Sequence, residues 1–312
     1  MSASLRAARV RVPGSTSNLG SGFDVLGLAV DRYLDVRFEP DDGGTVRLER
    51  TGLLRRLDGL AGRDLIEEAF STRLAAAGVR ASGVLRACSE IPIGRGLGSS
   101  AAAVVAGFDL ARAALGLPSD PDEAFAEVYR REGHGDNGAP SVWGGLRACV
   151  PGPEGPRVLE LALDPSVGFA YAAPSALLAT AEARAALPAS VPHATAVRGL
   201  GRILALLRGL ERGDPQLVRT GIEDELHVPH RLPLIPGGEA ALAAGYAAGA
   251  WGVTISGAGT GLLAICAADD AERVAEAMRA AFGGEPDDPE RVGFAIRPDP
   301  RGMRRLEMSA QD

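Results

Sequence analysis

The chain has 312 residues, of which 46% are hydrophobic and 23% charged, and its formal net charge is −7. This composition is typical of a globular protein with one large or two ordinary domains, and the negative charge argues against a nucleic-acid surface. No apolar run is long enough to span a bilayer and the first eleven residues lack the apolar core of a secretory signal, so we expect a cytoplasmic protein.

A polar, glycine-rich segment separates the first predicted strands. Residues 8–12 alternate in hydropathy and predict a strand that ends at Pro13, and apolar runs at 25–30 and 33–38 predict two more. The residues between, 14–24, are small, polar and rich in glycine. They predict a surface loop, which either carries function or is a flexible connection.

The rest of the first half mixes helices and strands. Apolar spacing in 64–77 predicts a helix, and Asp120 with Pro121 marks the start of another that extends to residue 131. Further strands are predicted at 45–50, 84–88 and 146–150. A Pro/Gly-rich break at 151–156 follows the last of them and predicts a boundary between domains 1–155 and 156–312.

A glycine-rich stretch, 90–102, leads from a predicted strand into an Ala-rich helix predicted over 99–115. Its glycines permit left-handed backbone angles, and Ser99 and Ser100 offer hydroxyls for capping, for phosphate or for Mg²⁺. A strand, a turn and a helix start direct free backbone N–H groups at an anion. The stretch therefore indicates either a phosphate loop or a capped turn, but not a Walker A loop, because the chain contains no Lys.

Four polar residues cluster after the second helix: Glu132, His134, Asp136 and Asn137. Such a cluster could be a metal site, a general base or a polar turn, and the residues alone leave all three open.

The second half also mixes helices and strands. Strands are predicted at 158–163, 168–173, 251–255, 262–266 and 294–297, and helices at 180–187, 194–211, 215–223, 240–250 and 271–282. A proline-interrupted segment, 224–236, and a second glycine turn, 256–261, lie between them. This mixture predicts an α/β (α+β) fold with two domains.

The three cysteines, Cys88, Cys149 and Cys266, are far apart and each lies in an apolar, strand-like run. We interpret them as buried small hydrophobic residues in a reducing compartment.

Three loops, in this order, resemble motifs of the galactokinase, homoserine kinase, mevalonate kinase and phosphomevalonate kinase (GHMP) superfamily of small-molecule kinases. Residues 13–24 resemble its N-terminal motif, 92–102 its Pro-x-x-x-Gly-Leu-Gly-Ser-Ser-Ala phosphate loop, and 256–259 its C-terminal glycine turn. Within that superfamily the chain is most similar to the homoserine kinases, through segments 18–24, 133–140, 180–188 and 226–237.

The resemblance implies a fold and an activity. The expected N-terminal domain is like domain 2 of ribosomal protein S5, the expected C-terminal domain is ferredoxin-like, and the active site lies between them. The expected reaction is ATP-dependent phosphorylation of L-homoserine to O-phospho-L-homoserine in threonine biosynthesis, with ATP and Mg²⁺, no nucleic-acid or membrane partner, and a homodimer as the suggested assembly. The alternatives are a kinase for another small hydroxy acid and a non-catalytic ligand sensor on the same fold.

The resemblance also implies substrate residues. Arg184 and Arg231 would bind the carboxylate, because the guanidinium fork matches a carboxylate. Asp24 and Asn18 would bind the ammonium, and Asn18 and Asp136 would orient the hydroxyl, with Asp136 positioning it rather than abstracting its proton. Asn137 is also expected to be one of the substrate-binding residues.

The resemblance also implies that the phosphate loop binds the triphosphate of ATP and that Asp64 lies near the adenine. The loop residues are Pro92, Gly94, Arg95, Gly96, Leu97, Gly98, Ser99, Ser100 and Ala101. Mg²⁺ prefers hard oxygen ligands, which Glu132 with Ser99 or Ser100 would supply, and Glu127 is the alternate.

The chain departs from the family pattern at several positions. Thr260-Gly261 stands where the family usually has Pro and a small hydroxyl residue, and Asp64 where it often has Asn. Thr195 and Gly199 replace an Asp and an Asn, and Gly135 replaces a Pro. These departures bear on efficiency and nucleotide preference more than on the fold.

Overall fold

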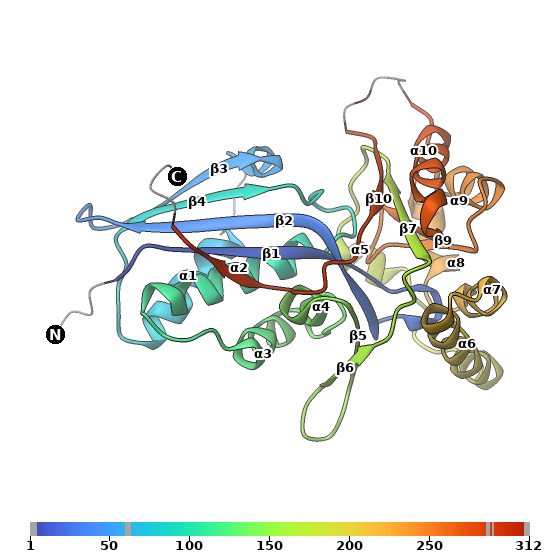
Figure 1. Cartoon of the computed structure of the whole chain (residues 1–312), viewed down its shortest axis with the longest axis horizontal. Coiled ribbons are helices and arrows are strands. Elements are labelled where there is room, and N and C mark those ends of the chain that lie inside the picture. The colour runs from blue at the N-terminus through green and yellow to red at the C-terminus, as the bar shows by residue number, and fades with distance from the viewer. Residues whose placement is uncertain (1–4, 60–63, 285–287, 289, 309–312) are drawn as a thin grey trace.

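The computed structural model describes residues 5–59, 64–284, 288 and 290–308, arranged around two sheets that lie side by side (Figure 1). One sheet has seven strands and the other four. The mixed two-domain fold predicted from the sequence is confirmed.

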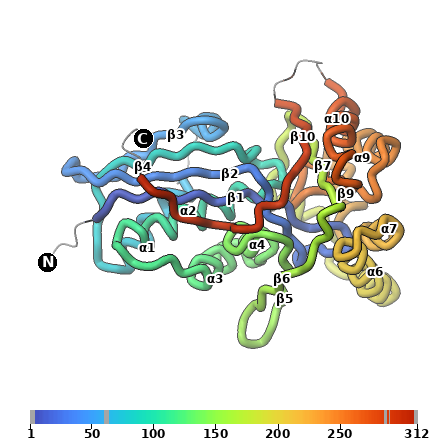
Figure 2. The backbone as a smooth tube through the Cα atoms, viewed as in Figure 1, coloured from blue at the N-terminus to red at the C-terminus, as the bar shows by residue number. Residues whose placement is uncertain are grey.

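The seven-stranded sheet is built on two long antiparallel strands, β1 (Ala8–Ser17) and β2 (Leu26–Pro40). The other strands are β3 (Val46–Gly52), β4 (Gly83–Ser89), β5 (Leu146–Val150), β6 (Arg157–Leu161) and β11 (Arg304–Leu306). The strand order is β11-β1-β2-β4-β3, and β5 pairs with both β2 and β6. Strand β11, which the sequence did not predict, returns to pair with β1 (Figure 2).

The prediction of a loop over 14–24 is wrong for the first residues of this segment. After a register shift between Pro13 and Gly14, β1 continues to Ser17 and pairs with β2. The hydroxyls of Ser15 and Thr16 are fully buried and hydrogen-bonded to Asn137 and Ser256. Polar residues form a buried strand here because distant segments satisfy them, which local polarity cannot reveal.

Helices cover one face of this sheet (Figure 1): α1 (Leu65–Ala76), α2 (Ser99–Ala114), α3 (Pro121–Glu132) and α4 (Gly138–Trp143). The predicted helix starts are confirmed, because the Asp64 side chain accepts the N–H of Ile66 and Asp120 accepts that of Glu123. Two short 3-10 turns, η1 (Gly20–Gly22) and η2 (Leu53–Leu57), lie between the strands. Helix α4 and η2 were not predicted.

The four-stranded sheet is antiparallel, in the order β10-β7-β9-β8, and comprises β7 (Val167–Ala173), β8 (Gly252–Ile255), β9 (Leu262–Ala267) and β10 (Val292–Ile296). Helices α9 (Gly238–Ala247) and α10 (Ala271–Ala281) pack on it. The remaining elements are α5 (Thr180–Ala185), α6 (His193–Arg212), α7 (Pro215–Ile222), α8 (Val228–Arg231), η3 (Leu232–Leu234) and η4 (Ala268–Asp270). The chain order β-α-β-β-α-β is the ferredoxin-like one.

The predicted break at 151–156 is the turn of the hairpin between β5 and β6. The seven-stranded sheet therefore takes two strands, β6 and β11, from beyond residue 155. The division into 1–155 and 156–312 stays a prediction.

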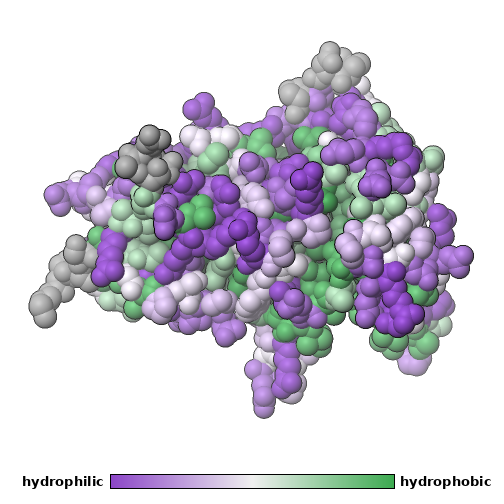
Figure 3. Space-filling view, viewed as in Figure 1, coloured by the Kyte–Doolittle hydropathy of each residue, from purple (hydrophilic) through white to green (hydrophobic). Residues whose placement is uncertain are grey.

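Cys149 and Cys266 are buried as predicted, but the prediction for Cys88 is wrong. Burial alternates along the end of β4, and Cys88 projects to the same side as the half-buried Arg86. Hydrophilic and hydrophobic side chains are interspersed over the visible face of the protein (Figure 3). In the part of the chain that the structure describes, no helix combines the length and the apolar character needed to cross a membrane.

Candidate active site

A cavity of about 590 Å³ lies where the two halves of the protein meet. Its walls come from the end of β1, the start of α1, the phosphate loop, the end of α3, helix α5 and the glycine turn after β8; they include Asn18, Leu65, Glu68, Gly94, Gly96, Gly98, Ser99, Ser100, Glu132, His134, Asn137, Arg184, Arg231 and Gly257. The fold thus brings together the three loops that the sequence singled out.

Alternate residues of the phosphate loop face this cavity. Gly94, Gly96 and Gly98 line it, with φ angles of 67°, 80° and 63° that favour glycine. Arg95 and Leu97 are only 3% and 1% exposed and turn into the protein. A Cβ on Gly96 would lie 1.8 Å from the carbonyl oxygen of Ser256, so this glycine is also required for packing.

Three consecutive carbonyl groups of the loop already accept hydrogen bonds from other parts of the protein. The Tyr171 hydroxyl donates to the Arg95 oxygen at 2.6 Å, the Ser256 hydroxyl to the Gly96 oxygen at 2.6 Å, and the Ser15 N–H to the Leu97 oxygen at 3.1 Å. Helix α2 then begins after Gly98, which has no side chain to cap it. The loop and the helix start therefore offer N–H groups, rather than carbonyl oxygens, to an anion.

Pro92, Leu97 and Ala101 are buried beneath this surface and do not line the cavity. Asp64 is occupied as the cap of α1 and as the partner of Arg50, with 3.0 Å between Arg50 Nη2 and the carboxylate. Its neighbour Leu65 faces the cavity instead. The role of Asp64 near the adenine stays a prediction.

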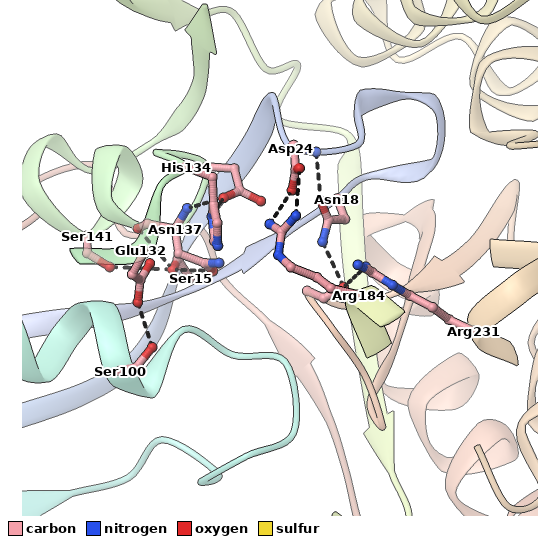
Figure 4. Close-up of polar contacts among 12 residues, drawn as sticks. Ser15, Asn18, Asp24, Ser100, Glu132, His134, Asn137, Ser141, Arg184 and Arg231 are labelled. Atoms are coloured by element: carbon pink, nitrogen blue, oxygen red, sulfur yellow. Dashed lines mark hydrogen bonds and ion pairs between the residues drawn. The ribbon is translucent and has the colours of Figure 1, made fainter. Parts of the chain in front are cut away.

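Glu132, at the end of α3, presents a carboxylate to the cavity (Figure 4). Ser100 Oγ donates to its Oε1 at 2.7 Å, whereas Oε2 is buried and has no hydrogen-bond partner among the described residues. Burial raises the pKa of Glu132, although the Ser100 hydrogen bond opposes this shift. A buried carboxylate oxygen beside a hydroxyl and an anion-binding loop fits a hard divalent cation such as Mg²⁺.

Glu127 is placed differently. Its two carboxylate oxygens accept hydrogen bonds from Arg130 at 2.5 Å and Arg131 at 2.6 Å. Two guanidinium groups already neutralise it, so it is less suited to a cation than Glu132 is.

Asn18, at the end of β1, is held on both sides. Its Nδ2 donates to the Gly257 carbonyl at 2.8 Å, and its Oδ1 accepts the N–H of Asp24 at 2.8 Å. The Asp24 carboxylate in turn accepts two hydrogen bonds from Arg184, at 2.8 and 3.1 Å (Figure 4). The guanidinium fork of Arg184 is therefore already occupied.

Arg231, the last residue of α8, is the second arginine at the cavity and is only 1% exposed. Its Nε donates to the Ala183 carbonyl at 3.1 Å and its Nη1 to the Gly257 carbonyl at 3.3 Å. Among the described residues it forms no ion pair, and burial with the nearby charge of Arg184 lowers its pKa. Asp24, Asp136 and Asp224 oppose this shift from a distance. A buried guanidinium that no described carboxylate contacts directly favours an anionic ligand.

Asp136 is nearly fully buried and does not line the cavity. Its Oδ1 contacts His134 Nδ1 at 2.5 Å and accepts the N–H of Asn137 at 3.1 Å, so it holds two residues that do line the cavity. Burial lowers the pKa of His134, but the hydrogen bond and charge of Asp136 outweigh this and raise it. Ser15 donates to Asn137 Oδ1 at 3.0 Å from the opposite side.

The sequence analysis counted His134 in the polar cluster without giving it a role of its own, and it assigned no role to Ser15 or Tyr171. The position of His134 in the same short segment as Asp136 was an available signal. Ser15 and Tyr171 act through contacts with distant segments, for which the sequence carries no local pattern.

Two family models match the chain: "GHMP kinases N terminal domain" over residues 64–145 and "GHMP kinases C terminal" over 206–284. The chain is 37% identical to the homoserine kinase of Gloeobacter violaceus over 95% of this chain and 97% of that protein. It is 39% identical to a homoserine kinase of Prochlorococcus marinus over 88% and 89% of the two chains.

Solved structures of other kinases have the same fold as this chain. The crystal structure of homoserine kinase from Cytophaga hutchinsonii matches with a TM-score of 0.81 and 26% identity, over 96% of this chain and 97% of that chain. The L. major mevalonate kinase in complex with R-mevalonate matches with a TM-score of 0.72, over 95% and 97% of the two chains. At 16% identity, the second match supports the fold alone.

Proposed function

The chain belongs to the homoserine kinase family of GHMP kinases, phosphotransferases with an alcohol acceptor, and from this membership we propose the reaction that its cleft performs. ATP donates its terminal phosphoryl group to the side-chain hydroxyl of L-homoserine, which gives ADP and O-phospho-L-homoserine. The hydroxyl oxygen forms the new P–O bond, the bond to the bridging oxygen of the β-phosphate breaks, and the hydroxyl proton is released.

The phosphate loop and the start of α2 would bind the triphosphate. Their N–H groups can face the cavity because Tyr171, Ser256 and Ser15 bind the loop carbonyls from behind. Phosphoryl transfer depends mainly on positioning and on neutralising charge, and fixed N–H dipoles in a buried site serve both purposes.

Glu132 and Ser100 would hold Mg²⁺, since Glu132 Oε2 is buried with no partner in the described part of the chain and Ser100 Oγ lies 2.7 Å from Oε1. When bound, this ion would neutralise charge on the phosphate oxygens. Ser99 also lines the cavity and offers a second hydroxyl in the same loop.

The observation that carries the substrate assignment is the buried guanidinium of Arg231, which no described carboxylate contacts directly. No described residue accepts a hydrogen bond from its Nη2, and the residue lies at the wall of the cavity. The carboxylate of an amino acid would supply the missing negative charge. The neighbouring Asp24–Arg184 ion pair then offers both charges to a zwitterion, with Asp24 and Asn18 toward its ammonium group.

The reacting hydroxyl would be oriented by Asn18, which is fixed by two hydrogen bonds at the cavity wall. Asp136 would contribute by positioning, through His134 and Asn137, because its own carboxylate lies behind them. The homodimer and the cytoplasmic location stay predictions.

A coupled assay of ADP release with ATP and Mg²⁺ tests this function over four acceptors: L-homoserine, mevalonate, pantoate and shikimate. We expect homoserine to give the highest kcat/KM, and mass spectrometry to show one added phosphoryl group on it. A higher kcat/KM with another acid would favour the alternative kinase. Binding of homoserine without ADP release would favour the sensor.

A further inference from the structure

Arg95 lies in the middle of the phosphate loop, yet its side chain does not face the cavity. It is 3% exposed, and its nearest loop neighbours Gly94 and Gly96 line the cavity while Arg95 does not. An arginine in such a loop would ordinarily be expected to bind phosphate, for which its guanidinium is well suited. Here the guanidinium is directed away from the place where phosphate would bind.

The guanidinium is bound instead to two segments of the other half of the protein. Its Nη2 lies 2.8 Å from Glu290 Oε2 and donates to the Ser175 carbonyl at 3.3 Å, while its Nη1 donates to the Glu290 carbonyl. Ser175 follows β7 and Glu290 precedes β10, and these strands pair so that Ala173 lies opposite Val292. Both acceptors therefore lie at one end of a single strand pair.

The backbone of Arg95 is attached to the same strand pair. Its carbonyl accepts the hydroxyl of Tyr171, a fully buried residue of β7, at 2.6 Å. Both the side chain and the peptide group of Arg95 are thus held by the four-stranded sheet. The flanking glycines have positive φ angles and no side chains, so they cannot hold the loop themselves.

We propose that Arg95 is a positioning residue for the nucleotide, which it never touches with its side chain, and that Glu290 and Tyr171 are its anchors. The Arg95–Glu290 pair and the Tyr171 hydroxyl fix the loop in the conformation that turns its N–H groups toward the phosphates. A flexible glycine loop would otherwise lose conformational freedom on binding, which weakens affinity. The inference rests on the proposed function, in which this loop binds ATP.

Three variants test it: Arg95→Met, which keeps an apolar chain of similar length, Glu290→Gln, and Tyr171→Phe, which removes one hydroxyl. Calorimetry would measure the Kd of ADP and, separately, of L-homoserine. We expect ADP to bind about tenfold more weakly to the first two variants, since each loses a charge-assisted contact that orders the loop. Homoserine affinity should stay within about twofold, because the Arg95 guanidinium contacts Ser175 and Glu290 whereas the Arg231 guanidinium contacts Ala183 and Gly257.

Two matched controls separate positioning from general loss of contacts. Arg56→Met removes the other arginine that pairs with Glu290 and leaves the Arg95–Glu290 contact in place. Tyr33→Phe removes a tyrosine hydroxyl that donates to Asp299 at 2.8 Å, outside the loop. Both should bind ADP as the wild type does.

Unchanged ADP affinity in Glu290→Gln and Tyr171→Phe would overturn the proposal, whether or not Arg95→Met folds. An equal loss of ADP and homoserine affinity that follows a fall in Tm would also overturn it, because it would assign Arg95 a purely structural role. If the wild type itself binds no ADP, the proposed function is wrong. That result differs from an unchanged ADP affinity in the variants, which would overturn only the role of Arg95.

Discussion

Glu127 and Glu132 lie near the end of the same helix, and their partners alone decide what each can do. Glu127 is bound by Arg130 and Arg131. Among the described residues, Glu132 is bound only by the Ser100 hydroxyl, and its other carboxylate oxygen is buried without a partner. The sequence suggested Glu132 as a metal ligand and Glu127 as the alternate. It could not show which carboxylate contacts Ser100, because helix spacing says nothing about contacts with a distant serine.

Glu132→Gln should lower kcat by on the order of a hundredfold or more, since a charged ligand lost from a buried site removes several kcal/mol of transition-state stabilisation. The affinity for ADP without Mg²⁺ should hardly change, because the loop N–H groups remain. Steady-state kinetics over a Mg²⁺ titration and calorimetry measure these two effects.

Glu127→Gln is the matched control for that variant. It leaves Arg130 without its carboxylate and Arg131 with Glu68 alone, so it should lower Tm while kcat stays near the wild-type value. Near-normal turnover in Glu132→Gln, together with a large loss in Glu127→Gln, would transfer the metal role to Glu127.

At the scale of elements, the sequence predicted those whose signals are local. The helix predicted over 64–77 begins after Asp64, which caps it, and Asp120 caps its helix as predicted; a cap involves residues only two or three positions away. The buried polar end of β1, the returning strand β11 and the short helix α4 were missed. Each depends on partners far along the chain, such as Ser256 for Thr16 or β1 for β11.

Helix α6 is tied to the segment before α8 by an exposed ion-pair cluster. Hydrogen bonds from Arg198 and Arg202 lower the pKa of Glu225 from 4.5 to about 2. Because the folded-state pKa is lower than the unfolded one, the cluster stabilises the protein above about pH 4.5. This contribution is lost as the pH falls toward about 2.

Glu225→Gln should therefore be less stable than the wild type at pH 6, and the difference should disappear as the pH is lowered toward 2. Tm values at several pH values in this window, at constant low ionic strength, measure the effect. A stability difference that does not vary with pH would show that the Glu225 charge contributes nothing and that the variant acts through shape alone.

At the scale of the whole molecule, the site exists only because the two halves meet. Asn18 bonds to Gly257 and Arg184 to Asp24, contacts that span 239 and 160 residues of the chain. The resemblance of the loops predicted which segments would meet. It did not predict that Arg184 is already paired, that Arg231 is buried with no ion pair to a described residue, or that Tyr171 holds the phosphate loop, because these depend on packing between the halves.

The proposed substrate recognition depends on Arg231, which would bind the carboxylate of the amino acid. The most direct measurement is kcat/KM for L-homoserine and for 3-aminopropan-1-ol, which is homoserine without its carboxylate, in the wild type and in Arg231→Met. Any general loss caused by releasing the Ala183 and Gly257 carbonyls affects both substrates and cancels in the ratio.

We expect the wild type to discriminate strongly against the amino alcohol. Arg231→Met should lose about ten- to hundredfold in kcat/KM for homoserine, as expected for about 1.5–3 kcal/mol from one charge-assisted contact, and should discriminate much less. The KM for ATP should hardly change, and Arg202→Met, which removes an arginine outside this cavity, should behave as the wild type. An equal loss of activity on both substrates would contradict the account, because Arg231 would then not bind the carboxylate.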